Sequence, residues 1–449
     1  MKRRAFLKLS SAALVVSRLR QSPSAFAQSR PLTNWAGNVR YSTHNVDDPD
    51  SLEAVQALVK GHDRLKVLGT RHCFNRIADS TDRLVAMTRL NRVVALDPER
   101  RLVTVEAGIT YGQLCPYLHD KGFALHNLAS LPHISVGGAC ATATHGSGVT
   151  NGNLATAVRG LEIVTADGSV LTLSADRDPE QLNAAVVALG ALGAVTKVTL
   201  AVQPTFAMRQ YVYEWLPTSQ LQEHFQQVMS AGYSVSLFTD WQRPSVNEVW
   251  VKSRADAAAR DEADLERYGA KRATKNLHPI AELSAVNCTE QMGVPGPWFE
   301  RMPHFRMGFT PSSGKELQAE YFVPQRHAVE AFLAISRLGP KIGPHLFISE
   351  IRTIAADDLW MSPCYKQASV TIHFTWKPEW PAVRQLLPVI EKELAPFGAR
   401  PHWGKLFTMS PAVLAARYER LAEFKREIAR YDPRGKFRND FLNTYMPSV

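Results

Sequence analysis

Glycine, hydroxyl and histidine side chains gather in three segments: Gly69–Asn75, Ser130–Gly138 and Ala141–Gly148. Each segment follows or interrupts a short apolar run that is typical of a strand. Glycine lets backbone N–H groups approach a pyrophosphate without interference from a Cβ atom. One such turn could merely join two strands. Three in order, with a further turn at Gly190–Gly193, predict the cradle of one large cofactor.

Several other kinds of site are not supported. No GxGxxG segment follows a strand and opens a helix, and no GxxxxGKS/T segment occurs, so neither a nicotinamide-type Rossmann site nor a P-loop is predicted. The cysteines are odd in number, widely spaced and without a CxxC pair, which argues against a disulfide framework and against zinc. We therefore expect no metal, and we expect most of the cysteines to be small buried residues. They are Cys73, Cys115, Cys140, Cys288 and Cys364.

A second group of chemically active residues lies much later in the chain. Glu350 and Arg352 are two positions apart in a predicted strand, and His373 and Thr375 have the same spacing in the next one. Residues two apart in a strand point to the same face of its sheet. An inward-facing charged pair needs partners or a polar ligand, because unpaired buried charge is costly. A structural salt bridge is one explanation. With Lys405 nearby in this group, a polyol site is favoured, since hydroxyls both donate and accept hydrogen bonds.

The order of the expected strands and helices predicts an α+β fold of two domains, with a boundary near residue 204. The first part has short strands and few helices, and its clearest hairpin is 161–173, which turns at Asp167-Gly168. From residue 317 the predicted order is strand, helix, strand, strand, helix, which suggests a sheet with helices on one face. The charged, alanine-rich stretch 253–273 is expected to be a solvated helix.

The first 27 residues are expected to be a targeting segment outside the fold. Lys2–Lys8 resembles a twin-arginine export signal, and Ala25–Ala27 offers a cleavage site. Arg18 and Arg20 shorten the apolar run between them, so a disordered basic tail is the alternative. We expect export by the twin-arginine machinery to a periplasmic or secreted location, in monomeric form.

Net charge and hydropathy argue against nucleic-acid binding and against a membrane span. The chain of 449 residues has a formal net charge of +10, and six of its cations lie in the first 27 residues, which contain no acid. The rest is close to balanced and has no basic cluster interleaved with aromatic residues, so nucleic acid is not an expected partner. No later apolar run is long enough for a membrane span.

The glycine-rich segments also carry a resemblance to a known family. Gly69–Asn75, Ser130–Ser135, Ala143–Gly148 and Gly190–Thr196 resemble the FAD-binding, PCMH-type domain of the vanillyl-alcohol oxidase superfamily. Within that superfamily the chain is similar to the aldonolactone oxidase branch, and most closely to bacterial alditol (xylitol) oxidases. The segments that carry this finer similarity are Ser349–Thr353, Leu359–Pro363, Ile372–Trp376 and Arg400–Phe407.

The resemblance implies a two-domain flavoprotein fold. The FAD domain would cover residues 30–204. A substrate domain with an antiparallel sheet covered by helices would cover 205–449, and its segment near 400–449 would return to the flavin. It also implies a histidine covalently joined to FAD, and His72 occupies that position. A neutral imidazole is a competent nucleophile toward the flavin 8-methyl group, and the bond raises the oxidising power of the flavin. A hydrogen-bonded surface histidine is the alternative.

Further contacts to FAD are implied for residues around the same loops. The usual serine after the attachment histidine is Cys73 here, a small-for-small change. His133 and His145 are expected mainly to brace their loops by hydrogen bonds. The full set expected around the cofactor is Val67, Leu68, Gly69, Thr70, Arg71, His72, Cys73, Ser130, Ser135, Gly138, Thr142, Ala143, Thr144, His145 and Val195.

The implied reaction oxidises the terminal hydroxyl of an alditol such as xylitol or sorbitol to the aldehyde. Hydride would pass to flavin N5, and O2 would take the electrons and form hydrogen peroxide. Either Lys405 or His373 would accept the hydroxyl proton, and His402 is expected to be structural. The implied catalytic set is Lys405, His373, Glu350 and Arg352, and Ser130 and Thr375 join these four in binding the substrate.

Three other functions remain open at this point. The nearest are an aldonolactone oxidase and a flavin-dependent polyol dehydrogenase that uses another electron acceptor. A non-catalytic flavin- or sugar-binding protein belongs to a different class. It is disfavoured because both His72 and Lys405 are present.

Overall fold

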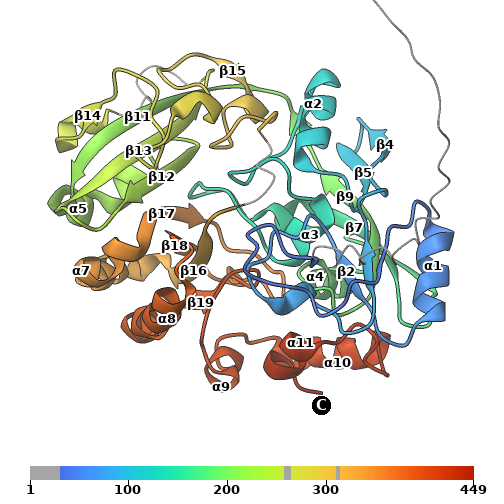
Figure 1. Ribbon diagram of the computed structural model, residues 1–449. Helices are drawn as coiled ribbons and strands as arrows, with labels where there is room; N and C mark the ends of the chain where they lie inside the picture. The colour runs from blue at the N-terminus through green and yellow to red at the C-terminus, as the bar shows by residue number, and fades with distance from the viewer. Residues whose placement is uncertain (1–30, 257–263, 310–313, 449) are drawn as a thin grey trace, which may run out of the picture. The chain divides into compact units, whose positions relative to one another are not determined.

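The computed structural model of the chain describes residues 31–256, 264–309 and 314–448. The predicted leader, residues 1–27, lies outside these ranges and stays a prediction. From Leu32 onward the chain forms one compact unit. Its two larger sheets lie on either side of residue 204 in the sequence, one between residues 93 and 201 and the other between residues 207 and 401 (Figure 1).

The first large sheet is antiparallel and contains the hairpin predicted from the sequence. Its strand order is β4-β5-β9-β7-β8, and the predicted hairpin 161–173 is the β7–β8 pair. Inward and outward side chains alternate along β9, which accounts for its burial on one face. The strands are β4 (Val93–Asp97), β5 (Leu102–Glu106), β7 (Val158–Val164), β8 (Val170–Ser174) and β9 (Ala194–Ala201).

A small parallel sheet leads into the first glycine-rich segment. In it β3 (Leu84–Ala86) lies between β1 (Val46–Asp47) and β2 (Lys66–Leu68). The helix before β2 is α1 (Leu52–Gly61), whose first turn is capped by the Ser51 hydroxyl. Because β2 ends at residue 68, the Gly69–Asn75 loop begins where its strand leaves the sheet.

Helices between these strands bring the other glycine-rich segments to the same place. The second segment opens α3 (Val136–Ala141), and α4 (Pro179–Val186) precedes the Gly190 turn. Between β5 and these segments lies α2 (Tyr111–Asp120), which begins with a Thr110–Gln113 capping box.

The second sheet contains nine strands within the described residues, and all its recorded pairs are antiparallel. The main order is β14-β11-β13-β12-β17-β18-β16-β19, and β15 pairs with β11. The strands are β11 (Ala207–Pro217), β12 (Ser234–Thr239), β13 (Ser245–Arg254), β14 (Lys271–Arg272), β15 (Gly296–Pro297), β16 (Leu317–Pro324), β17 (Leu346–Ile354), β18 (Ser369–Trp376) and β19 (Arg400–Pro401).

Helices cover one face of this sheet, as the sequence predicted (Figure 1). They are α5 (Thr218–Met229), α6 (Ala328–Ser336) and α8 (Trp380–Leu394), and their apolar side chains pack with those of the central strands. Ile351 and Phe374 belong to this core. Since side chains alternate along a strand, the neighbours of these residues face the opposite side of the sheet.

The predicted solvated helix at 253–273 is wrong wherever this stretch is described. β13 continues to Arg254, a 3-10 turn follows at Leu265–Tyr268, and β14 begins at residue 271. Gly269 ends the turn at φ 81°, which is left-handed and incompatible with a continuing α-helix. Residues 257–263 of the stretch lie outside the described residues.

The C-terminal helices pack on the first half of the chain rather than on the second sheet. They are α9 (Pro411–Ala415), α10 (Leu421–Tyr431) and α11 (Asp440–Tyr445), and they share a core cluster with β5 and β7. The Asn439 side chain donates to three backbone carbonyls between residues 76 and 79. In the described part of the chain no helix combines the length and the apolar character that crossing a membrane would need.

Candidate active site

Two adjoining cavities lie beside the glycine-rich loops. One, of about 240 Å³, faces the second sheet, and the other, of about 120 Å³, extends toward the first sheet. Leu68, Gly69, Ser135, Gly138 and Thr142 line both, so the two form one elongated space.

The structure brings together nearly all the residues predicted to contact FAD. The one exception is Ala143, which is fully buried, lines neither cavity and holds a left-handed φ of 54°. The residues that line one or both cavities are Val67, Leu68, Gly69, Thr70, Arg71, His72, Cys73, Ser130, Ser135, Gly138, Thr142, Thr144, His145 and Val195.

The lining of this space fits an elongated dinucleotide such as FAD. A Cβ atom at Gly69 would lie 2.5 Å from the Ser135 hydroxyl, and one at Gly138 would lie 2.9 Å from it, so only glycine permits this approach. Arg71, next to His72, has a left-handed φ of 61°, a strained conformation of the kind found at binding loops.

His72 is held among other rings of the first half of the chain. Its Nδ1 lies 3.2 Å from His133 Nε2, and its ring centroid is 4.4 Å from that of Trp35. Burial, with the neighbouring His133 and Lys405, lowers the pKa of His72 to about 3. The imidazole is therefore neutral at ordinary pH, which is the nucleophilic form.

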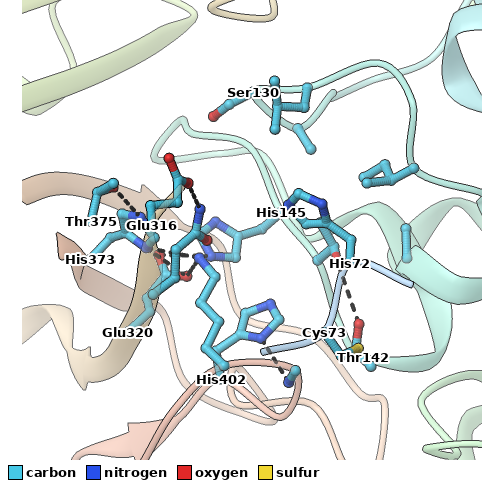
Figure 2. Close-up of a pocket in the computed structure, with 18 of the residues that line it drawn as sticks. His72, Cys73, Ser130, Thr142, His145, Glu316, Glu320, His373, Thr375 and His402 are labelled. Carbon is cyan, nitrogen blue, oxygen red and sulfur yellow. Dashed lines mark hydrogen bonds and ion pairs between the residues drawn. The ribbon is translucent and has the colours of Figure 1, made fainter. Parts of the chain in front are cut away.

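The second sheet presents a row of polar residues to the cavity. Strand register places Glu320 of β16 and Glu350 of β17 on either side of His373 of β18. Lys405, in the loop after β19, reaches this row from one side. Its Nζ donates to Glu320 Oε2 at 2.6 Å and lies 2.8 Å from His373 Nδ1. On the other side of the ring, His373 Nε2 lies 3.0 Å from Thr375 Oγ1 (Figure 2).

Arg352 completes a buried cluster of two acids and two cations. Its Nη2 donates to Glu320 Oε1 at 3.3 Å, and its Nε is 3.4 Å from Glu350 Oε1. Burial opposes ionisation of Glu320, but Lys405 and His145 outweigh it and hold the pKa of this carboxyl well below its usual range. The charges balance, which is what allows them to be buried.

Two members of this cluster, His373 and Lys405, have lowered pKa values and can therefore accept a proton. Burial lowers the pKa of His373 to about 4, and the charge of Lys405 acts in the same direction. Burial also lowers the pKa of Lys405, although Glu320 opposes the change. A neutral histidine and a lysine that loses its proton more readily than usual thus face the same space.

All six residues predicted to bind substrate line the larger cavity: Ser130, Glu350, Arg352, His373, Thr375 and Lys405. Figure 2 shows Ser130 on the segment before α3, well apart from Glu320 and His373.

Sequence reasoning missed several polar residues of this cavity, among them Glu316, Gln318, Glu320, His278 and His304. Gln318 and Glu320 have the same two-residue spacing in an apolar strand that drew attention to Glu350 and Arg352, so that signal was present. His304 lies in an irregular segment, where no periodicity marks it. In the described ranges, no group of three or more His, Cys, Asp or Glu side chains has an arrangement that could hold a metal ion.

The His72 loop and the Lys405 loop are tied directly to each other. The Phe74 N–H donates to Gly404 O at 2.7 Å. The Asn75 side chain donates to Trp403 O at 2.7 Å and to Lys405 O at 2.8 Å. The position of Lys405 is therefore coupled to the loop that carries His72.

Replacing Asn75 with alanine is expected to loosen this connection. Two backbone carbonyls lose their donor, so the free energy of unfolding should fall by about 1–3 kcal/mol, and turnover should fall with it. Urea unfolding and steady-state kinetics measure both. Asn91→Ala is the matched control, because that amide donates one exposed hydrogen bond, to Thr88 O. Equal losses in the two variants would contradict a special role for Asn75.

Family models match both halves of the chain. A model described as "FAD binding domain" matches residues 45–174, and one described as "D-arabinono-1,4-lactone oxidase" matches residues 311–445. Together these ranges include the glycine-rich loops and the charged row.

Curated relatives match over almost the full length. An alditol oxidase from Streptomyces is 45% identical over 417 residues, which cover 92% of this chain and 98% of the relative. A bovine L-gulonolactone oxidase is 27% identical, covering 91% and 96%. An L-gulono-1,4-lactone dehydrogenase from Mycobacterium tuberculosis is also 27% identical, covering 91% and 97%.

Solved structures share the fold at low sequence identity. Cholesterol oxidase from B. sterolicum has a TM-score of 0.74 at 14% identity and covers 93% of this chain and 96% of its own. A carbohydrate oxidase from Microdochium nivale has a TM-score of 0.72 at 13% identity, covering 95% and 96%. The predicted two-domain α+β flavoprotein fold is confirmed by these neighbours and by the FAD-binding match.

Proposed function

The chain belongs to the alditol oxidase family, in the aldonolactone oxidase branch of the PCMH-type flavoproteins, and on that premise we propose how its residues perform the reaction. It is an FAD-dependent oxidase that converts the terminal hydroxyl of an alditol to the aldehyde and reduces O2 to hydrogen peroxide. One observation carries the assignment of the site: the row of Glu320, His373 and Glu350, with Lys405, lines the same cavity as His72.

The charged row suits a substrate whose every carbon bears a hydroxyl. Carboxylates accept hydrogen bonds, Arg352 and Lys405 donate them, and the hydroxyl of Thr375 does both. As an ammonium, Lys405 has three N–H donors, and Glu320 and His373 engage two of them. The third is available to the oxygen of the reacting hydroxyl. The Lys405 ammonium can therefore hold the reacting hydroxyl, and with it the carbinol carbon, at a fixed position.

Oxidation of an alcohol removes a hydride from carbon and a proton from oxygen. FAD, when bound, accepts the hydride and is reoxidised by O2. The chain must take up the proton, and the Lys405–His373 pair is placed for this: a deprotonated Lys405 can accept it, or Lys405 can pass its own proton to His373 Nδ1, 2.8 Å away, as it accepts the new one. Glu320 then stabilises the resulting cation, because its carboxylate lies 2.6 Å from Lys405 Nζ.

We also propose that FAD is covalently attached through His72. Three observations support this: the neutral state of the imidazole, its place in the lining of the larger cavity, and its contact with His133. A His72 Nδ1–H that donates to His133 Nε2 would leave the Nε2 lone pair of His72 free for bond formation.

Substrate and acceptor are tested together by steady-state turnover. We expect xylitol and sorbitol to be oxidised in air with one hydrogen peroxide formed per O2 consumed, and with a higher kcat/KM than L-gulono-1,4-lactone. Without O2, turnover should stop after the bound flavin is reduced. A higher kcat/KM for the lactone would establish the lactone oxidase instead. Turnover that needs an artificial acceptor in air would establish a dehydrogenase.

A further inference from the structure

A buried lysine that the proposed reaction does not use lies behind the charged row. Lys252 of β13 is 1% exposed. Its Nζ donates to the carbonyl oxygens of Met302 at 2.6 Å and Pro303 at 2.8 Å, and lies 3.2 Å from His304 Nδ1.

These contacts determine which nitrogen of His304 carries the proton. An ammonium has three N–H donors and no acceptor, so the two carbonyls and His304 Nδ1 use all of its donors. Glu350 Oε1, which can only accept, lies 2.7 Å from His304 Nε2, so the proton of the neutral ring lies on Nε2 and Nδ1 accepts from Lys252. The ring cannot turn easily, because its centroid is 5.3 Å from that of Phe238 and 5.2 Å from that of Trp250, edge to face with both.

The Nε2–H of His304 is aimed at the site. It lies 2.7 Å from Glu350 Oε1, the same oxygen that faces Arg352 Nε at 3.4 Å. The hydrogen bond from His304 and the positive charge of Arg352 therefore both act on Oε1. None of the described residues donates a hydrogen bond to Oε2, and Glu350 lines the cavity. One carboxylate oxygen is held and the other is free to accept from a ligand.

We propose that Lys252 and His304 are positioning residues that hold Glu350 in one orientation, with Oε2 presented to a hydroxyl of the alditol away from the reacting carbon. This rests on the proposed function and adds a determinant of substrate affinity to it. Lys252 acts through His304, and His304 acts through Glu350. Without Lys252, His304 Nδ1 and the carbonyls of Met302 and Pro303 lose their donor, so Nε2 is no longer held 2.7 Å from Glu350 Oε1.

A purely structural role makes a different prediction. Lys252 could serve only to hold the 302–304 segment against β13, and His304 only to fill the space between two aromatic rings. Substitutions would then lower stability and flavin content, with no selective effect on the KM for alditols. The two roles are separated by the KM and kcat of variants that keep or remove the donor to Glu350.

Two substitutions of His304 form a matched pair. In His304→Gln the amide nitrogen reaches the position of Nε2 and keeps the donor to Glu350. In His304→Asn the amide reaches only the position of Nδ1 and keeps the contact with Lys252. For xylitol we expect the KM to rise by about 10- to 100-fold in His304→Asn and Lys252→Met, the range of a lost charge-assisted hydrogen bond. The kcat should stay within about threefold, and the KM of His304→Gln should be close to that of the wild type.

A double-mutant cycle with Glu350→Gln gives the second test. If His304 acts through Glu350, His304→Asn should add little to the KM of the Glu350→Gln variant. Additive effects, or equal KM values for His304→Gln and His304→Asn, would overturn the proposal. Melting temperature and flavin absorbance report folding in each variant. If Lys252→Met does not fold, the His304 pair and the cycle decide alone.

Failure of the proposed function is recognised separately. It would appear in the wild type, as absent turnover of alditols. If a lactone proves to be the substrate, the same KM comparison is made with that lactone. The outcomes for the His304 pair, for Lys252→Met and for the double-mutant cycle are then interpreted in the same way.

Discussion

Replacing Lys405 with methionine is expected to lower kcat/KM for xylitol by about 10²- to 10⁴-fold, the usual range for loss of a group that transfers a proton in the reaction. Methionine keeps most of the side-chain volume but can neither donate to the hydroxyl nor accept its proton. Lys405 lines the larger cavity, on the side of the second sheet, and does not line the smaller cavity that extends toward the first sheet. The FAD content should therefore be unchanged. Stopped-flow measurement of flavin reduction isolates the step, which should be slowed by the same factor.

The same substitution also unbalances the buried charges. Glu320 would lose its partner at 2.6 Å, and two carboxylates would face Arg352 alone. Breaking a buried ion pair costs about 3–5 kcal/mol, so the melting temperature should fall as well. A loss of activity that came only from this instability would not identify a catalytic group.

The double variant Lys405→Met with Glu320→Gln separates the two effects. It removes one charge of each sign, so the free energy of unfolding should return most of the way to that of the wild type. Flavin reduction should stay slow. If the double variant recovered both the free energy of unfolding and the rate of flavin reduction, Lys405 would serve charge balance only. A single Lys405→Met variant with bound flavin and full turnover would rule out the catalytic role altogether.

Local pattern was enough to predict part of the polar lining of the cavity, while the flavin contacts and the role of Lys405 came from the family resemblance. The two-residue spacing of Glu350 and Arg352 indicated an inward polar face, and β17 has that face. The Gly69 loop followed a predicted strand, and β2 is that strand. In both cases the deciding information lies within a few residues of sequence, so it is visible without the rest of the fold.

The parts that were missed depend on contacts between distant segments. Glu320 becomes the centre of the charged cluster only through the register of β16 with β18 and the return of the Lys405 loop. His304 reaches Glu350 only because Lys252 of β13 holds its segment. A strand pairing of this kind is set by the packing of the whole sheet and not by local propensity.

Cys73, which stands beside His72 where the family pattern has serine, acquires a physical explanation. Cys73 lines both cavities, and burial raises the pKa of its thiol to about 12, so it stays neutral. Its Sγ lies 3.2 Å from the place where a Cβ atom at Gly404 would be. We therefore interpret Cys73 as a small neutral side chain that packs between the two loops, a place that serine can also fill.

Replacing His72 with alanine is expected to abolish covalent flavin while leaving FAD able to bind. In the wild type, an acid-precipitated pellet should stay yellow, and mapping of the yellow peptide should find His72. In the His72→Ala variant the pellet should be colourless and the flavin should be recovered in the supernatant. The remaining lining of the two cavities is unchanged by this substitution, so non-covalent FAD still has its cradle.

Attachment should also change the flavin itself. Since the bond raises the oxidising power of the flavin, the midpoint potential of the variant should be lower, and hydride transfer from xylitol should be slower. Cys73→Ser is the matched control in the same loop, and it should keep the covalent bond and the wild-type potential. Flavin released entirely by acid from the wild type would refute the attachment, and so would a flavin peptide that lacks His72. In either case the role of the loop would reduce to shaping the cavity and fixing Lys405 through Asn75.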